Sequence, residues 1–243
     1  MANKEKRIAM WSGPHTISAQ LLRAFENRQD TQVIDEPFFA YFLAHSDIEH
    51  PARVAILKTE VIDSVAIETA LLAPLKPGKT IFYQNHMSHH LKIGMDQTWI
   101  EHMTHAFLIE DPIRTLARHD PSEGLPSISD TGLPQQMSMF DYVADKFGSP
   151  PPVIDAADLR KNPAKILNKL CNALGIAVDE AMLAWPKGNR DSDGASKRWG
   201  DSDIAETTSF EKPLGRSPRL DDELLHLADL AMPYYERLLR YRL

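Results

Sequence analysis

Apolar and polar positions near the start of the chain predict a buried strand, a tight turn and an amphipathic helix. Residues 8–11 are apolar throughout, and Gly13 and Pro14 mark a turn directly after them. Apolar side chains then recur at helical spacing, at Ile17, Leu21, Leu22 and Phe25. The start of such a helix offers free backbone N–H groups to an anion. The pattern therefore predicts a phosphate-binding loop.

Short apolar runs continue to alternate with helical patterns as far as residue 185. Strands are predicted over residues 7–11, 31–35, 80–84, 106–109 and 152–155. Helices are predicted between them, over residues 53–73, 97–102, 112–118, 136–147 and 163–174. Apolar strands separated by helices are typical of a parallel sheet that is covered on both faces. We therefore expect an α/β fold of three layers around a central, mostly parallel sheet, followed by a C-terminal helical segment.

The expected organisation has three parts. Residues 1–185 form the α/β domain, and residues 186–218 form a polar loop or lid that is rich in Gly, Asp, Ser, Lys and Pro. Residues 219–243 form a C-terminal helix that packs on the same domain. Because this helix carries a stripe of leucines, it could also pair with the same helix of a second copy, giving a homodimer.

Composition narrows the class of protein. The chain has 243 residues, of which 43% are hydrophobic, and a formal net charge of -7. This charge argues against a nucleic-acid partner, although a local basic pocket for a small anion stays compatible with it. The single cysteine, Cys171, falls on the apolar face of a predicted helix and indicates packing. Without a leader-like run or a membrane-length apolar segment, we expect a cytoplasmic protein with a small-molecule substrate and no membrane partner.

Three segments resemble a known family, in that family's order. They are the loop and helix at residues 8–25 with the following 25–39, the segment Thr104–Ala117, and the segment Val153–Ile176. They are similar to the sulfotransferase-like P-loop family, particularly its small bacterial members. The resemblance implies a nucleotide-binding transferase of small-molecule metabolism. Such an enzyme moves a sulfuryl group from 3′-phosphoadenosine-5′-phosphosulfate (PAPS) to an acceptor.

The resemblance also implies where the donor binds. The implied donor-binding residues are Ser12, Gly13, Pro14, His15, Thr16, Ile17, Ser18, Arg114, Arg118, Lys197 and Arg198. The family carries cations in the loop, after the third strand and after the fourth, where this chain has His15, Asn85 and Glu110. A carboxylate beside a phosphate is unfavourable unless it is protonated, bridged by a metal or turned away. Three explanations stay open: PAPS binds with compensating cations, another donor or reaction is used, or the protein is a non-catalytic ligand-binding relative.

Four residues are candidates for catalysis: His86, His15, Glu36 and Glu110. His86 ends the third predicted strand, where it could take a proton from an acceptor, and His15 and Glu110 could act as an acid and a base. Glu36 ends the second strand and could serve as a base or cap the next helix. His89 and His90 follow His86, so a histidine-based hydrolase or lyase, with or without a metal, is an alternative function. We expect no metal, because no cysteine pair or carboxylate cluster accompanies the histidines.

Overall fold

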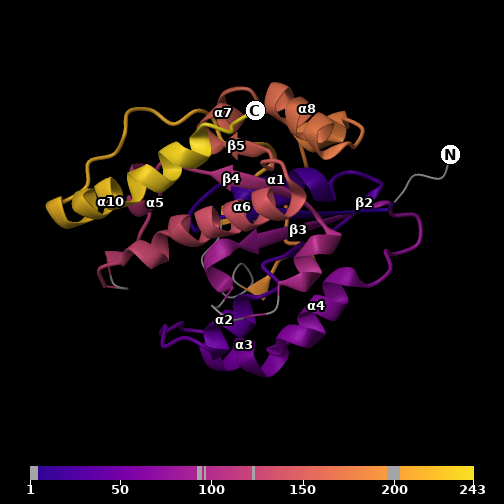
Figure 1. Ribbon diagram of the computed structural model, residues 1–243, viewed down its shortest axis with the longest axis horizontal. Coiled ribbons are helices and arrows are strands. Elements are labelled where there is room, and N and C mark those ends of the chain that lie inside the picture. The colour runs from indigo at the N-terminus through magenta and orange to yellow at the C-terminus, as the bar shows by residue number, and fades with distance from the viewer. Residues whose placement is uncertain (1–4, 92–94, 96, 122–123, 196–202) are drawn as a thin grey trace.

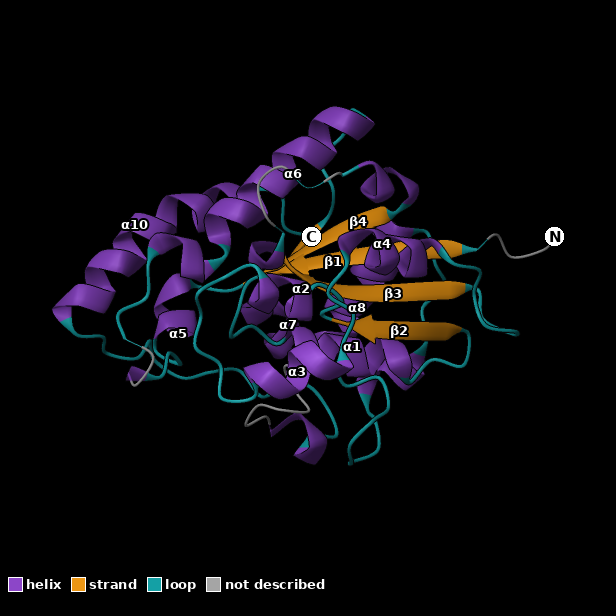
Figure 2. Ribbon diagram, turned by 90° about the horizontal axis from the view of Figure 1, so that it is seen from below, coloured by secondary structure: helices purple, strands orange, loops and turns teal. Residues whose placement is uncertain are grey.

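The computed structural model of the protein describes residues 5–91, 95, 97–121, 124–195 and 203–243. Five strands form one sheet in the order β2-β3-β1-β4-β5, and every neighbouring pair is parallel. Figure 2 shows the first four of these strands side by side. The strands are β1 (Lys6–Ser12), β2 (Thr31–Asp35), β3 (Ile81–Met87), β4 (Thr104–Ile109) and β5 (Val153–Asp155). The predicted α/β fold with a central parallel sheet is confirmed.

Helices cover both faces of this sheet (Figure 1). The α-helices of the described residues are α1 (Ser18–Glu26), α2 (Phe39–Ala44), α3 (Arg53–Thr59), α4 (Ser64–Leu72), α5 (Pro112–Leu116), α6 (Leu133–Phe147), α7 (Ala156–Lys161), α8 (Pro163–Leu174) and α10 (Asp222–Leu239). The 3-10 helices are η1 (Ser88–His90), η2 (Thr98–His102), η4 (Ile128–Thr131), η5 (Glu180–Leu183) and η6 (Asp203–Glu206).

The core consists of two main apolar clusters, one on each face of the sheet. Along β1, Ile8 and Met10 belong to the cluster that includes α1 and α8, whereas Ala9 and Trp11 belong to the cluster that includes α4, α6 and α10. This division follows from the strand itself, because successive side chains point to opposite faces. It explains why the central strands are apolar at nearly every position.

The structure corrects the prediction of one helix over residues 53–73. The chain leaves the helical conformation after Thr59, and α4 begins only at Ser64. Asp63 caps this second helix, since its side chain accepts a hydrogen bond from the backbone N–H of Ala66. The apolar pattern runs across the break, so periodicity did not reveal it.

The polar stretch after residue 185 is attached to the domain by several contacts, including an ion pair and an aromatic contact. Asp193 forms an ion pair of 2.7 Å with the buried Arg23 of α1. The ring of Phe210, which is buried, packs edge-on against Trp185. Further along the chain, Leu227 and Ala228 of α10 pack against Leu116.

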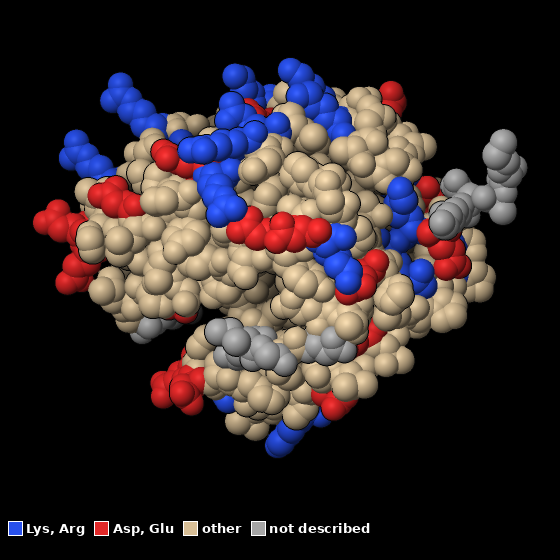
Figure 3. All heavy atoms as spheres, in the orientation of Figure 1, with Lys and Arg blue, Asp and Glu red and all other residues tan. Residues whose placement is uncertain are grey.

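Charged side chains are unevenly distributed. On the face shown in Figure 3, Lys and Arg side chains gather over α7 and α8, and acidic side chains gather at the N-terminal end of α10. Among the helices that the structure describes, none combines the length and the apolar character needed to cross a membrane.

Candidate functional site

The candidate site lies at the carboxyl end of β1. At this strand the order of the sheet changes direction, because β2 and β3 lie on one side of β1 and the later strands β4 and β5 lie on the other. Strand β1 is the third of the five, with β3 on one side and β4 on the other. Ligands of such sheets bind beyond the carboxyl ends of the strands at this reversal point. The buried side chain of Gln136 on α6 joins the two strand ends there, donating to the carbonyl oxygens of Trp11 at 3.0 Å and Leu108 at 2.8 Å.

The loop after β1 packs closely against the backbone at Thr131. A Cβ on Gly13 would lie 2.9 Å from the carbonyl oxygen of Thr131, so only glycine fits there. The Thr16 hydroxyl donates to the carbonyl oxygen of Gly13 at 3.1 Å. His15, which is exposed, has a φ of 57°, an uncommon conformation for a residue with a side chain. Strained backbone of this kind concentrates at functional sites.

The loop leads into α1, whose first turn carries no acidic residue of its own. The N-cap residue is Ile17, which supplies no side-chain hydrogen bond. Within the described residues, the backbone N–H groups of Ile17 and Ser18 have no hydrogen-bond acceptor. Free N–H groups and the helix dipole together favour a negative charge at this end of α1.

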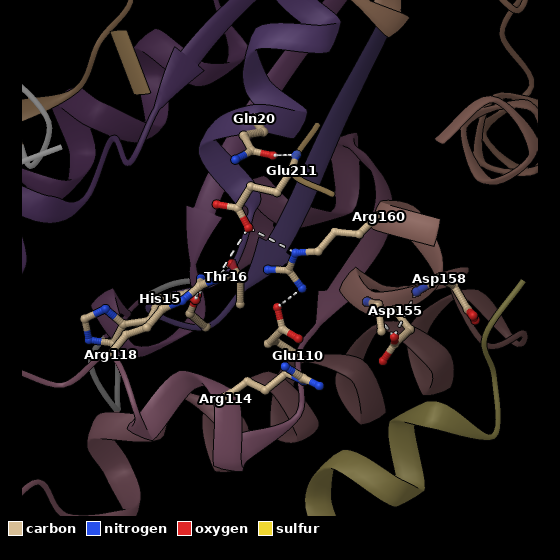
Figure 4. A network of polar contacts seen from close by, with 12 residues as sticks. His15, Thr16, Gln20, Glu110, Arg114, Arg118, Asp155, Asp158, Arg160 and Glu211 are labelled. Atoms are coloured by element: carbon tan, nitrogen blue, oxygen red, sulfur yellow. Dashed lines mark hydrogen bonds and ion pairs between the residues drawn. The ribbon is translucent and has the colours of Figure 1, made fainter. Parts of the chain in front are cut away.

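Two arginines lie beside the loop (Figure 4). Arg118, which follows α5, donates from Nη1 to the carbonyl oxygen of His15 at 2.8 Å. Arg160 comes from α7 on the far side of β4, and its Nη1 is 2.5 Å from Oε2 of Glu110. The side chains of Arg160 and Glu110 are both 1% exposed. The carboxylate at position 110 is therefore neutralised by an arginine, an arrangement that the sequence did not predict.

Each partner of this buried pair keeps one unused polar atom. Oε1 of Glu110 and Nη2 of Arg160 are buried and have no hydrogen-bond partner among the described residues. Burial raises the pKa of Glu110 above its usual value, and the neighbouring charge of Arg160 opposes that rise. Buried polar atoms normally have partners, so the unused guanidinium nitrogen is a candidate ligand-binding atom.

A second carboxylate, that of Glu211, joins the two arginines. Its Oε2 lies 3.1 Å from Nε of Arg160 and 3.5 Å from Nη2 of Arg118. Its backbone N–H donates to Oε1 of Gln20 on α1 at 2.9 Å. Figure 4 shows the contacts of this carboxylate with both arginines.

The structure thus brings the loop, Arg118 and Glu110 of the predicted site together. Arg114 does not join this group. Its side chain donates instead to the carbonyl oxygen of Gly215 at 2.8 Å. Lys197 and Arg198 lie outside the described residues.

His86 is packed in the core. It is 2% exposed, its ring stacks on that of Trp11 with centroids 4.7 Å apart, and its Nε2 lies 3.2 Å from Oε1 of Gln84. Burial, with His105 as a second cause, lowers the pKa of His86 to about 3. The side chain follows Trp11 onto the α6 face of the sheet, the face opposite α1. This placement favours packing over proton transfer at the loop.

Glu36 and its neighbour Asp35 are buried at the end of β2. Asn85 donates from Nδ2 to Oδ1 of Asp35 at 2.7 Å, and the backbone N–H of Glu36 donates to the carbonyl oxygen of Asn85 at 2.9 Å. Glu36 has a φ of 45°. Helix α2 begins later, with Phe38 as N-cap and no side-chain cap, so neither carboxylate caps it.

Sequence reasoning missed Arg160, Gln20 and Glu211. Arg160 and Glu211 are 50 and 101 residues from Glu110 in sequence, and no local pattern links them. One sequence signal could have identified Arg160. It follows the end of β5 by less than two helical turns, which places it near the carboxyl ends of the strands, where ligands bind. Among the residues that the structure describes, no group of three or more His, Cys, Asp and Glu side chains is placed to hold a metal ion.

Curated proteins similar to this chain are longer than it. Two proteins of Arabidopsis thaliana, described as branched-chain-amino-acid aminotransferase-like proteins 1 and 2, are 30% and 28% identical over 207 and 210 residues. Each match covers 85% of this chain but only 37% and 36% of the two relatives. The chain therefore spans little more than a third of their length.

Solved structures share the fold. The sulfotransferase domain from the curacin biosynthetic pathway has a TM-score of 0.54 at 13% identity, with 95% of this chain and 99% of that one covered. A sulfotransferase from Alicyclobacillus acidocaldarius has a TM-score of 0.56 at 12% identity, with 100% and 98% covered. Finally, the family described as the sulfotransferase domain matches residues 6–241. The chain belongs to the sulfotransferase domain family.

Proposed function

We propose that the protein transfers a sulfuryl group from PAPS, or from a closely related 3′-phosphorylated donor, to a small-molecule acceptor. Family membership and fold support a sulfotransferase-like enzyme. The observation that carries the proposal is the N-terminus of α1, where the N–H groups of Ile17 and Ser18 have no acceptor among the described residues and Arg118 is bound to the same loop at His15. This arrangement fits the phosphate of a nucleotide.

The residues present also fit the second phosphate of such a donor. Sequence alone leaves this in doubt, because Glu110 stands where the family has a cation. In the structure Arg160 lies against Glu110, and its buried Nη2 is available for a further acceptor. Arginine suits this task because its fork of N–H groups binds two anions at once. In this proposal the cation for the second phosphate is Arg160 of α7, rather than a residue at the end of β4 as in the family.

In the transfer step the acceptor oxygen or nitrogen forms a bond to sulfur while the bond between sulfur and the phosphate oxygen of the donor breaks. Negative charge grows on that phosphate oxygen, where the backbone N–H groups of the first turn of α1 would stabilise it. The proton of the acceptor must pass to a base. We assign this role to His15, which is exposed on the loop and is held in an unfavourable backbone conformation.

Isothermal titration calorimetry with 3′-phosphoadenosine-5′-phosphate (PAP) tests the proposal. The account predicts that PAP binds at least tenfold more tightly than adenosine 5′-monophosphate, which lacks the 3′-phosphate. The variant Arg118→Gln should weaken PAP binding, whereas Lys187→Gln, which removes an exposed partner of Glu206, should not. Equal binding of the two nucleotides would point to a donor without a 3′-phosphate. No binding of either would contradict the proposal.

A further inference from the structure

Glu211 holds the position that an incoming anion needs. Its Oε2 is shared between Nε of Arg160 and Nη2 of Arg118, at 3.1 and 3.5 Å. Arg118 also donates to the carbonyl oxygen of His15 in the phosphate-binding loop (Figure 4). A carboxylate and a phosphate oxygen make the same demands on a guanidinium group. One carboxylate oxygen therefore stands where a phosphate oxygen would bind.

The position of Glu211 is fixed by its surroundings. The preceding residue, Phe210, is buried against Trp185, and the backbone N–H of Glu211 is bound by the buried side chain of Gln20. The chain on either side therefore need not move when the carboxylate leaves. Its side chain is 39% exposed, so a rotation toward solvent releases both arginines.

The charge balance of the pocket gives the consequence. With Glu211 in place, two carboxylates face Arg118 and Arg160, and the two pairs of charges cancel. With Glu211 turned out, Glu110 is the one carboxylate still paired with these arginines among the described ion pairs, and Nη2 of Arg160 is already without a partner among the described residues. An anion gains a net positive site only after this displacement.

We propose that Glu211 is an internal competitor for the donor's phosphate-binding position, and that it sets the affinity and selectivity of that position. This inference rests on the proposed function for the identity of the donor. A ligand with a single weak negative charge would fail to displace the carboxylate, whereas a phosphate group with two charges would succeed. Glu211 therefore acts as a specificity-determining residue at the rim of the site.

The test compares PAP binding to the wild type and to Glu211→Gln by calorimetry. Glutamine keeps the length of the side chain and removes its charge, so the variant should bind PAP at least tenfold more tightly. Glu206→Gln is the matched control, since Glu206 is a more exposed glutamate a few residues away, paired only with Lys187 among the described ion pairs, and its loss should change nothing. Equal or weaker PAP binding by Glu211→Gln would overturn the inference and leave the proposed function standing.

Inorganic phosphate separates the two proposals when neither protein binds PAP. That outcome would contradict the proposed donor, but the inference concerns the anion position itself. Tighter binding of inorganic phosphate by Glu211→Gln than by the wild type would still support the competitor role. Equal phosphate affinities would overturn it.

Discussion

Arg160 of α7 and Glu110 at the end of β4 form an ion pair of 2.5 Å in which both side chains are 1% exposed. The pair ties α7 to the carboxyl edge of the sheet beside the phosphate-binding loop. A buried charge of either sign is tolerated only with a compensating partner. The two residues therefore depend on each other, and each determines what substitution the other accepts.

The first prediction concerns the removal of Glu110. Glu110→Ala should lower the free energy of unfolding by up to about 3–5 kcal/mol, because the buried Arg160 would keep only the partly exposed carboxylate of Glu211 as a partner. Urea unfolding followed by circular dichroism measures this change. Glu110→Arg, which the family pattern would suggest for phosphate binding, should be at least as damaging, since it sets two buried arginines against each other.

An exposed pair provides the control. Arg237 and Asp141 are 2.6 Å apart, with side chains 52% and 42% exposed. Asp141→Ala should cost no more than about 1 kcal/mol, since exposed ion pairs contribute little. Similar losses for the two alanine variants would mean that the Glu110 pair is not buried as described.

Much of the fold could be predicted from the sequence, because buried parallel strands have a strong local signal. The apolar run at residues 8–11 and the strand at 31–35 both match the structure. Helix breaks were harder to predict: the break before Asp63 depends on a cap within an unbroken apolar pattern. Arg160 could not be paired with Glu110 at all, since the contact joins residues 50 positions apart through the order of strands in the sheet.

The second prediction concerns acid stability. Burial lowers the pKa of His86 to about 3 and that of His105 to about 4. Because these values lie below the unfolded value of about 6.5, the unfolded chain binds protons first, and stability is complete only above that pH. Stability should fall as the pH drops from about 6.5 to about 4, by up to about 1.4 kcal/mol per pH unit for each histidine.

Urea unfolding at pH 7.5 and pH 5.5 measures this dependence. His86→Phe keeps an aromatic ring on Trp11 and removes one of the two titrating groups, so the loss between these pH values should shrink to about half. An unchanged loss in the variant would mean that His86 is protonated in the folded protein. The same variant also tests whether His86 is the base that the sequence predicts. Turnover should be lost if His86 accepts the proton, and should be retained if its role is packing.

The third prediction concerns the tight contact under the loop. In Gly13→Ala the new Cβ would meet the carbonyl oxygen of Thr131 at 2.9 Å, so the loop must shift. We expect at least tenfold weaker PAP binding and a loss of about 1–3 kcal/mol in stability. Gly215→Ala is the control, because nothing lies within 4 Å of its added Cβ and no positive φ is required there. If Gly13→Ala bound PAP as well as Gly215→Ala does, the loop would not be the binding element.

The fourth prediction separates backbone strain from chemistry at His15. Its φ of 57° suits glycine, so His15→Gly should leave the free energy of unfolding unchanged or raise it by up to about 1 kcal/mol. If the imidazole is the base, turnover should nevertheless fall by about 100-fold or more. His45→Gln, at an exposed histidine stacked on Tyr41, should retain turnover. Full activity in His15→Gly would remove the imidazole from the mechanism.

A crystal structure of the protein with PAP tests the central claim most directly. The account predicts the 5′-phosphate on the first turn of α1, with its oxygens at about 2.7–3.2 Å from the backbone nitrogens of Ile17 and Ser18. The 3′-phosphate should contact Arg118 and Nη2 of Arg160, with the Glu211 carboxylate turned away. Nucleotide bound elsewhere, or bound here with Glu211 still between the two arginines, would contradict the account.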